Sequence, residues 1–130
     1  MKKNNVAKEL ISLKINANRI SWGETGAKGK FSQKLDILFL IGECEMHSPR
    51  NIMRELVMAK SNVALICNSL CASGYLVKRN AGTNKKEIGY YITKSGSQYL
   101  SSRLEDIEKM LGNISADTLE KVNEKLWGVN

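Results

Sequence analysis

The fold is decided by residues 48–93, which read SPRNIMRELVMAKSNVALICNSLCASGYLVKRNAGTNKKEIGYYIT. Ser48-Pro49 is a start signal for a helix, because a capping hydroxyl is followed by proline at the first helical position. We expect this helix to run from Pro49 to about Met58. Its inward side chains are predicted to be Ile52, Met53 and Leu56.

A second short helix follows a break near Ala59-Lys60, and Ser61 is expected to cap or open it. Gly74 is well placed to end this helix in a left-handed conformation. The apolar face is predicted to consist of Val63, Ile66, Cys67 and Leu70.

The segment after Gly74 has the pattern of a β-hairpin. Tyr75–Arg79 and Ile88–Thr93 are rich in β-branched and aromatic residues, and Asn80–Lys86 between them has turn chemistry with two lysines. Two short helices joined by a tight turn and followed by a hairpin form a winged helix-turn-helix. In that motif the second helix is the recognition helix, whose N-terminal residues meet base edges in the major groove of DNA.

Helices are predicted on both sides of this motif. Ser32 can cap a helix through Leu35–Ile41 that is apolar on nearly every side, so we expect it to be central. Val6–Trp22 has one apolar stripe, and the glycine-containing stretch Gly23–Lys30 reads as a loop. A long helix from Ser95 is interrupted at Gly112-Asn113, and Ser115 can cap its continuation. The predicted fold is therefore mainly α with a small β-hairpin wing (α+β).

We interpret residues 1–130 as a single domain, with the winged helix in residues 32–94 and dimerisation helices in residues 5–22 and 95–127. The terminal helices carry apolar stripes that a small winged helix cannot cover, so a second copy of the chain is the economical partner. The residues expected to mediate dimerisation are Val6, Leu10, Leu13, Leu104, Ile107, Leu111, Leu119, Val122 and Leu126.

Composition and charge agree with one folded domain that binds a polyanion. The chain is 42% hydrophobic and 25% charged, with a formal net charge of +7, of which residues 47–94 contribute +6. A concentrated basic segment favours a nucleic acid partner, because Lys and Arg contacts to phosphate release counterions. No apolar run approaches the roughly 20 residues that cross a bilayer, and no secretion signal is recognisable. With three cysteines, an odd number, we expect a cytoplasmic protein without membrane contact.

Catalytic motifs are missing from the sequence. It has one histidine and none of the usual nucleophile, zinc-protease or phosphate-loop signatures, so we expect no enzyme and no cofactor. Cys67 and Cys71 lie one helical turn apart, and Cys44 and His47 form a second close pair, which makes a zinc site conceivable. Cys67 falls on an apolar face, where a free cysteine behaves as a small hydrophobe, and we therefore predict no metal. A redox role for Cys44 or Cys71 stays open.

The chain resembles the MarR-type (multiple antibiotic resistance) family of transcriptional regulators. The resemblance extends over roughly residues 31–126 and rests on the order and spacing of several short motifs rather than on one diagnostic motif. The matching segments are residues 52–56 (IMREL), 60–63 (KSNV), Leu70, 74–79 (GYLVKR), 92–96 (ITKSG) and 114–118 (ISADT). The resemblance implies a homodimeric repressor on a pseudo-palindromic DNA site, with release by a small ligand in a cleft that Trp22, Phe31 and Met46 would border.

Two positions depart from the family pattern. Where the family wing usually has an Asp and an Arg, this chain has Asn84, Lys85 and Lys86, and lysine lacks the flat fork that suits a narrow minor groove. Ala59 replaces the hydroxyl residue that usually precedes the recognition helix, which leaves capping to Ser61 or water.

The predicted DNA contacts lie on the recognition helix and around the wing. Asparagine suits bidentate pairing with adenine, and Ala64 or Leu65 suits a thymine methyl group. The alternative is a solvated polar face with charges that serve solubility and keep the hairpin edge from pairing. The predicted contacts are Arg50, Lys60, Ser61, Asn62, Ala64, Leu65, Asn68, Ser69, Arg79, Asn84, Lys85 and Lys86.

The sequence thus predicts a sequence-specific regulator that binds double-stranded DNA as a homodimer. One alternative is a winged helix used as a protein-interaction module without specific DNA binding. The other is a regulator that responds to metal or oxidants.

Overall fold

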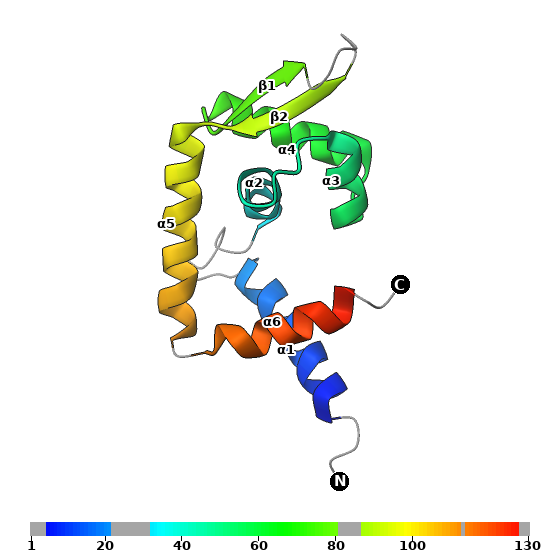
Figure 1. Ribbon diagram of the computed structural model, residues 1–130, viewed down its shortest axis with the longest axis vertical. Coiled ribbons are helices and arrows are strands. Elements are labelled where there is room, and N and C mark those ends of the chain that lie inside the picture. Colours follow the sequence, from blue (N-terminus) through cyan, green and yellow to red (C-terminus); the bar gives the residue numbers. More distant parts are fainter. Residues whose placement is uncertain (1–4, 22–31, 81–86, 113, 128–130) are drawn as a thin grey trace.

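A computed structural model describes residues 5–21, 32–80, 87–112 and 114–127 (Figure 1). Helices and a two-stranded antiparallel sheet follow one another as the sequence predicts, which confirms the mainly helical fold with a hairpin wing. The elements in chain order are α1 (Asn5–Ser21), α2 (Gln33–Gly42), α3 (Pro49–Leu56), α4 (Lys60–Ala72), β1 (Leu76–Asn80), β2 (Ile88–Ile92), α5 (Lys94–Leu111) and α6 (Ala116–Trp127).

Helix α2 is the centre of the core, as its apolar sequence predicts. Its N-cap is Ser32, whose hydroxyl accepts a hydrogen bond from the Leu35 backbone N–H at 3.2 Å. Side chains on most sides of the helix are buried because α4, α5 and β2 pack around it. The core residues are Leu35, Ile37, Leu38, Leu40, Ile41, Ile52, Val63, Cys67, Leu70, Leu76, Tyr90 and Leu100.

Helix α3 starts at the predicted residue but lacks the predicted capping hydrogen bond. Pro49 is the first helical residue and Ser48 is the N-cap, yet the Ser48 side chain makes no capping hydrogen bond, so that expectation is wrong. The helix also ends at Leu56, two residues earlier than expected, because Val57 takes a left-handed conformation with φ 53° and ψ 53°.

Helix α4 begins one residue earlier than the sequence analysis expects. Its N-cap is Ala59, whose carbonyl oxygen accepts hydrogen bonds from the backbone N–H groups of Asn62 and Val63, both at 3.1 Å. Ser61 therefore lies inside the first turn, and the expectation that it caps the helix is wrong. The predicted end is confirmed, since Gly74 follows the helix with φ 82°.

The hairpin forms within one residue of its predicted limits. Leu76 pairs with Ile92 and Asn80 with Ile88, in antiparallel register. Leu76 and Tyr90 point into the core, where Tyr90 is 4% exposed. The other face of the hairpin carries Val77 and Tyr91, which are a cross-strand pair.

Thr93 and Gly96 join the hairpin to α5. The Thr93 hydroxyl accepts a hydrogen bond from the Gly96 N–H at 3.0 Å and donates one to the Gly74 carbonyl oxygen at 2.6 Å. Its backbone N–H donates to the Tyr75 carbonyl oxygen at 3.0 Å. A Cβ atom on Gly96 would overlap that same Tyr75 carbonyl, so only glycine fits without a shift of the backbone. Thr93 therefore fixes the end of α4, the base of the wing and the start of α5 together.

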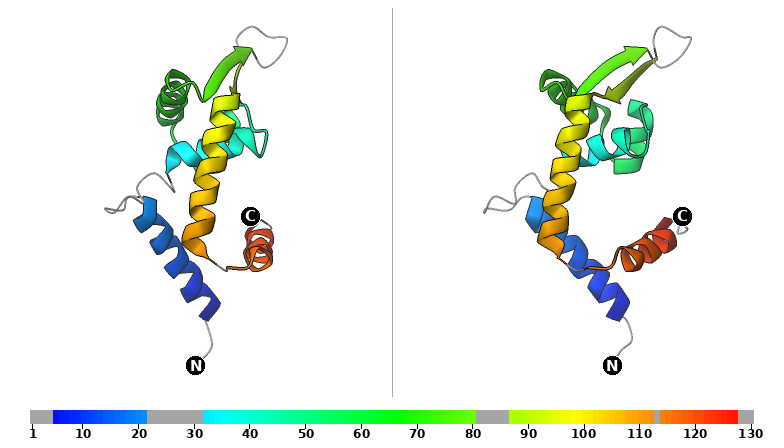
Figure 2. Two further views of the ribbon diagram at one scale, coloured as in Figure 1. Left: turned by 90° about the vertical axis from the view of Figure 1, so that its left-hand side faces the viewer. Right: turned by 60° about the vertical axis from the view of Figure 1, so that its left-hand side comes forward.

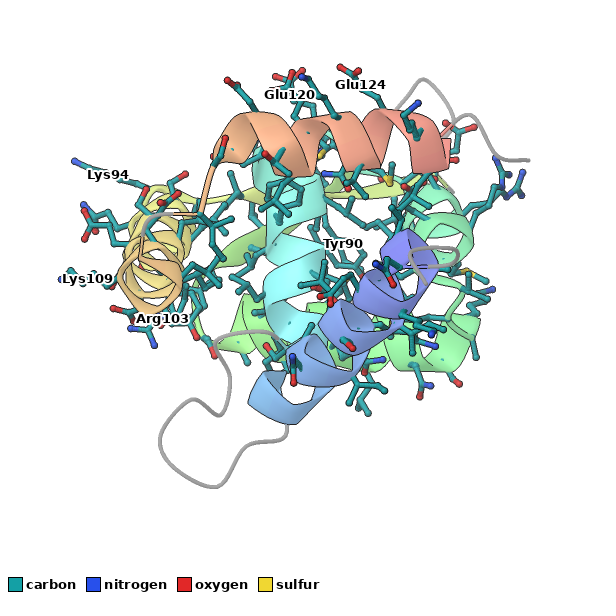
Figure 3. All side chains as sticks on the ribbon, turned by 90° about the horizontal axis from the view of Figure 1, so that it is seen from below. Tyr90, Lys94, Arg103, Lys109, Glu120 and Glu124 are labelled. Carbon is teal, nitrogen blue, oxygen red and sulfur yellow. The ribbon has the colours of Figure 1, made fainter. Side chains whose placement is uncertain are left out.

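The winged motif and the terminal helices lie at opposite ends of the molecule, and α5 spans the distance between them (Figures 1 and 2). Helices α1 and α6 make few contacts with the other described elements. On α6, Glu120 and Glu124 point away from α1 (Figure 3). Within the described ranges, no helix is both long enough and apolar enough to span a membrane.

The predicted dimerisation residues fall into two groups. Leu104 and Ile107 on α5 are partly buried against the core of their own chain. Most of the others are exposed: Val6, Leu10, Leu13, Leu111, Leu119 and Leu126. Val122 is half-buried. The terminal helices thus leave an apolar surface open, while the two α5 residues already have partners within the chain.

Candidate nucleic-acid interface

Helix α4 presents one face to the core and an opposite face to solvent. Val63 and Cys67 are fully buried, and Leu70 is 2% exposed, which anchors the helix against α2 and the hairpin. The outward face is formed by predicted DNA contacts. Of these, Lys60, Ser61, Asn62, Leu65 and Asn68 are exposed, whereas Ala64 and Ser69 are half-buried.

Leu65 stands out on this outward face because it is a large apolar side chain that is 70% exposed. Its neighbours one turn before and one turn after are polar, namely Ser61, Asn62, Asn68 and Ser69. Most of its apolar surface is therefore open to solvent and accessible to a partner.

Helix α3 and strand β1 pack against α4 at the same end of the molecule, and they carry basic residues (Figure 1). Lys60 lies at the N-terminus of α4, Arg50 in the first turn of α3, and Lys78 and Arg79 on β1, and all four are exposed. Exposed cations that flank a helix in this way are the kind of group that contacts DNA phosphates. Asn84, Lys85 and Lys86, predicted at the wing tip, lie outside the described residues.

His47 and Tyr91 connect the hairpin to the loop before α3, and the sequence analysis did not predict this contact. The imidazole Nδ1 of His47 lies 2.9 Å from the Tyr90 carbonyl oxygen, and its ring stacks on Tyr91 with centroids 4.2 Å apart. Because a carbonyl oxygen only accepts, Nδ1 carries the proton in this contact. The guanidinium of Arg79 lies 5.5 Å from the centroid of the Tyr91 ring, so a cation–π contact steadies one of the predicted DNA contacts. The alternation of Ile88–Ile92, which sends Tyr91 to the face opposite Tyr90, was the signal available in the sequence.

The cysteines do not gather into a metal site. Among the described residues, which include all three cysteines and His47, no group of three or more potential ligands is close enough to hold an ion. Burial raises the pKa of the Cys67 thiol to about 11. The pKa values of Cys44 and Cys71 are also raised, first of all by burial, and Glu43 and Glu55 add to the effect at Cys44. Raised pKa values disfavour the reactive thiolate form of these thiols.

An open hollow of about 500 Å³ lies along α3 and the turn after it. It combines two guanidinium groups with apolar side chains, and its lining residues are Arg50, Met53, Arg54, Val57 and Met58. The sequence analysis expected a ligand cleft elsewhere, bordered by Trp22, Phe31 and Met46. Trp22 and Phe31 lie outside the described residues, and Met46 packs against the core.

No protein-family model matches the chain, and no curated protein matches it. Solved structures do match over almost its whole length. The multiple antibiotic resistance repressor MarR has a TM-score of 0.70 and 14% identity, over 92% of this chain and 93% of that one. BpsR of Bordetella bronchiseptica, described with regulation of its DNA binding by 6-hydroxynicotinic acid, has a TM-score of 0.67 and 8% identity, over 100% and 97%. FabT of Streptococcus pneumoniae in complex with DNA has a TM-score of 0.60 and 17% identity, over 95% and 92%.

The chain therefore has a winged helix fold flanked by terminal helices. In particular, it is the fold of MarR-type transcriptional regulators, which confirms the resemblance seen in the sequence at the level of structure. Of these structural neighbours, MarR is a repressor, and FabT is bound to DNA in its solved structure.

Proposed function

We propose that the protein is a sequence-specific transcriptional regulator that binds double-stranded DNA as a homodimer. The observation that carries the proposal is the outward face of α4, whose exposed polar side chains lie at the same end of the molecule as Arg50, Lys60 and Arg79. A helix with base-reading side chains between phosphate-binding cations has the arrangement that major-groove recognition requires.

The apolar surfaces of α1 and α6 support the homodimer. On α6 the apolar side chains Leu119, Val122 and Leu126 recur at helical spacing, while Glu120 and Glu124 point away from α1 (Figure 3). Two copies related by a two-fold axis would place two α4 helices about 34–36 Å apart, one turn of DNA. The proposed target is therefore a pseudo-palindrome, and repression would follow from occlusion of a promoter.

Selection from a random pool of DNA duplexes tests this proposal. We expect enrichment of an inverted repeat that the protein binds at least about a thousandfold more tightly than random DNA at physiological salt. The affinity for the enriched site should fall steeply as salt rises, with a slope set by the number of phosphate contacts. Absence of an enriched sequence, with only weak and salt-dependent binding, would overturn the proposal in favour of a protein-interaction module.

Variants on the proposed face separate base contacts from phosphate contacts. Asn62→Ala and Asn68→Ala should each weaken binding to the selected site by about tenfold or more and leave binding to random DNA almost unchanged. Lys60→Ala and Arg50→Ala should weaken both, and each should reduce the salt slope by about 2, because each removes one phosphate contact from each copy of the homodimer. Lys121→Ala on α6 is the matched control, because this exposed lysine lies at the opposite end of the molecule.

Release of DNA by a small ligand is the second part of the proposal, and it is supported by the reported regulation of BpsR by 6-hydroxynicotinic acid. A ligand releases DNA only to the extent that it binds the DNA-incompetent spacing of the dimer more tightly. A screen of small aromatic acids against the complex with the selected site tests this part. A hit must weaken DNA binding in a saturable way, and it must bind free protein more tightly than DNA-bound protein.

A further inference from the structure

Helix α4 carries a distinctive set of groups for reading bases. From Ser61 to Ala72 it has no arginine, lysine or acidic residue, and Lys60 at its first position is its only charged side chain. The outward side chains are amide, hydroxyl and apolar groups: Ser61, Asn62, Leu65 and Asn68, with Ala64 and Ser69 half-buried beside them.

These groups match one type of base pair. Guanine is read chiefly by arginine or lysine, which donate two hydrogen bonds to its O6 and N7, and cytosine by a carboxylate that accepts from N4. The outward face between Ser61 and Ala72 offers neither. Adenine is read by asparagine through N6 and N7, and thymine presents a methyl group that an apolar side chain can contact.

Arg79 lies on β1, and its contact with Tyr91 holds the guanidinium away from the outward face of α4. Its guanidinium lies over the ring of Tyr91 on the face of the hairpin that His47 covers, with 5.5 Å between guanidinium and ring centroid. In that position the Arg79 guanidinium is better placed to bind a phosphate beside the groove than the edge of a guanine that α4 would contact.

We infer that α4 reads a short run of consecutive A·T pairs, and that Leu65 recognises the 5-methyl group of a thymine between two asparagine-bound adenines. The inference rests on the proposed function and specifies what its site reads. Asn62 and Asn68 are six residues apart, which corresponds to about 9 Å along a helix. At about 3.4 Å per base, this distance covers two to three base-pair steps. Leu65 lies midway between them and is 70% exposed, so its side chain reaches the central pair first.

Contact with a methyl group would also cover apolar surface of Leu65. In the free protein this side chain is 70% exposed, and the thymine methyl is the only apolar group that a base pair presents in the major groove. Removal of one methyl from such a contact is expected to weaken binding about fourfold. Two half-sites altered together should weaken it by roughly fifteenfold, because separate positions add.

Deoxyuridine scanning of the selected DNA site tests the inference. Each thymine in a half-site is replaced in turn by deoxyuridine, which removes the methyl and keeps the Watson–Crick pair. We expect one thymine per half-site at which binding weakens about fourfold. In Leu65→Ala that loss should vanish, because the side chain that covers the methyl is gone. The adenines on either side are tested with 7-deazaadenine, which lacks the N7 acceptor. Its effect should disappear in Asn62→Ala at one position and in Asn68→Ala at another.

Val57→Ala is the matched control, because Val57 is another exposed apolar residue, 90% accessible, that lies outside α4. It should keep the full deoxyuridine effect. Thermal melting of Leu65→Ala should match the unaltered protein, since the truncated atoms lie outside the core.

The outcomes separate this inference from the proposed function. A selected inverted repeat with G·C pairs at the centre of each half-site would overturn the inference and keep the regulator. The same holds if deoxyuridine is harmless everywhere, or if Leu65→Ala leaves its effect unchanged, and Leu65 would then be assigned to a protein contact. Failure to select any site would overturn both.

Discussion

The winged end and the terminal helices differ in how much of their apolar surface is buried within the chain. In the winged end, α2, α3, α4, the hairpin and the first half of α5 enclose one core, in which Ile37, Leu38 and Ile52 are completely buried. In the terminal helices, Val6 is 82% exposed and Ile11 58%, and α1 and α6 have few contacts within the chain. The difference teaches that one end buries its apolar residues within the chain, whereas the other leaves them exposed, where the proposed second copy would cover them.

The largest effect is expected from a charge on the apolar stripe of α1. Leu13→Glu removes apolar surface from the proposed interface twice, once per copy, and should raise the dimer dissociation constant about a thousandfold. Analytical ultracentrifugation measures it. Lys8→Glu is the control, since Lys8 lies on the opposite side of the same helix. Equal effects of the two changes would contradict the proposed interface.

A core truncation should act on the other region alone. Ile52→Ala leaves a cavity where the side chain is completely buried, and we expect the free energy of unfolding to fall by about 3–4 kcal/mol. Chemical denaturation measures the loss, and dimer affinity of the remaining folded protein should stay unchanged. A loss below about 1 kcal/mol would mean that this core is less tightly packed than its burial indicates.

The junction between the two regions should be sensitive to a single methyl group. Gly96→Ala places a Cβ against the Tyr75 carbonyl oxygen, and the backbone shift should cost about 2–3 kcal/mol. Gly74→Ala is the comparison, because an added Cβ at Gly74 meets no atom within 4 Å. Any loss of stability in that variant comes from the φ of 82° and not from a steric clash. If Gly96→Ala melts at the same temperature as the unaltered protein, the added Cβ is accommodated without a backbone shift, which would contradict this prediction.

Alkaline pH should weaken the winged end through Cys67. Its thiol has an ordinary pKa of 9.0, and burial raises that pKa to about 11 in the folded chain. Below pH 9 both states keep the proton; between pH 9 and 11 the unfolded state loses it first, so stability falls by about 2 kcal/mol over this range. Denaturation at several pH values measures the slope, and Cys67→Ala should flatten it. An unchanged slope would assign the loss to other groups, such as Tyr90, whose pKa burial also raises.

The smallest effect is a gain. Val57 ends α3 with φ 53° although it is β-branched, and its side chain is 90% exposed, so it has strain without burial. Val57→Asn should raise the free energy of unfolding by about 1 kcal/mol, because asparagine tolerates the left-handed conformation. Thermal melting checks this, with Val57→Ile as the control that keeps the strain. A lower melting temperature for Val57→Asn would show that the exposed side chain has a role within the chain.

Periodicity and turn chemistry in the sequence determined the order of the elements, the limits of the hairpin within one residue and the inward faces of α2, α3 and α4. These signals are local, since an apolar stripe or a glycine after a helix reports on the few residues around it. The capping hydroxyls were the weak point. Ser48 makes no capping bond and Ser61 lies inside α4, because a hydroxyl near a helix start favours a cap but does not fix which residue becomes the N-cap.

Only the tertiary structure decided which apolar residues of the long helix α5 pack against the core of the same chain. Leu104 and Ile107 share a stripe with Leu111, yet the first two pack on the core and Leu111 is exposed, because α5 extends beyond the winged end. The stacking of His47 on Tyr91 and the closeness of Gly96 to Tyr75 likewise depend on segments distant in sequence. The sequence by itself thus determined which residues are suited to the core and which are suited to DNA contact. The packing of distant segments decided which residues are buried in the core and which remain exposed.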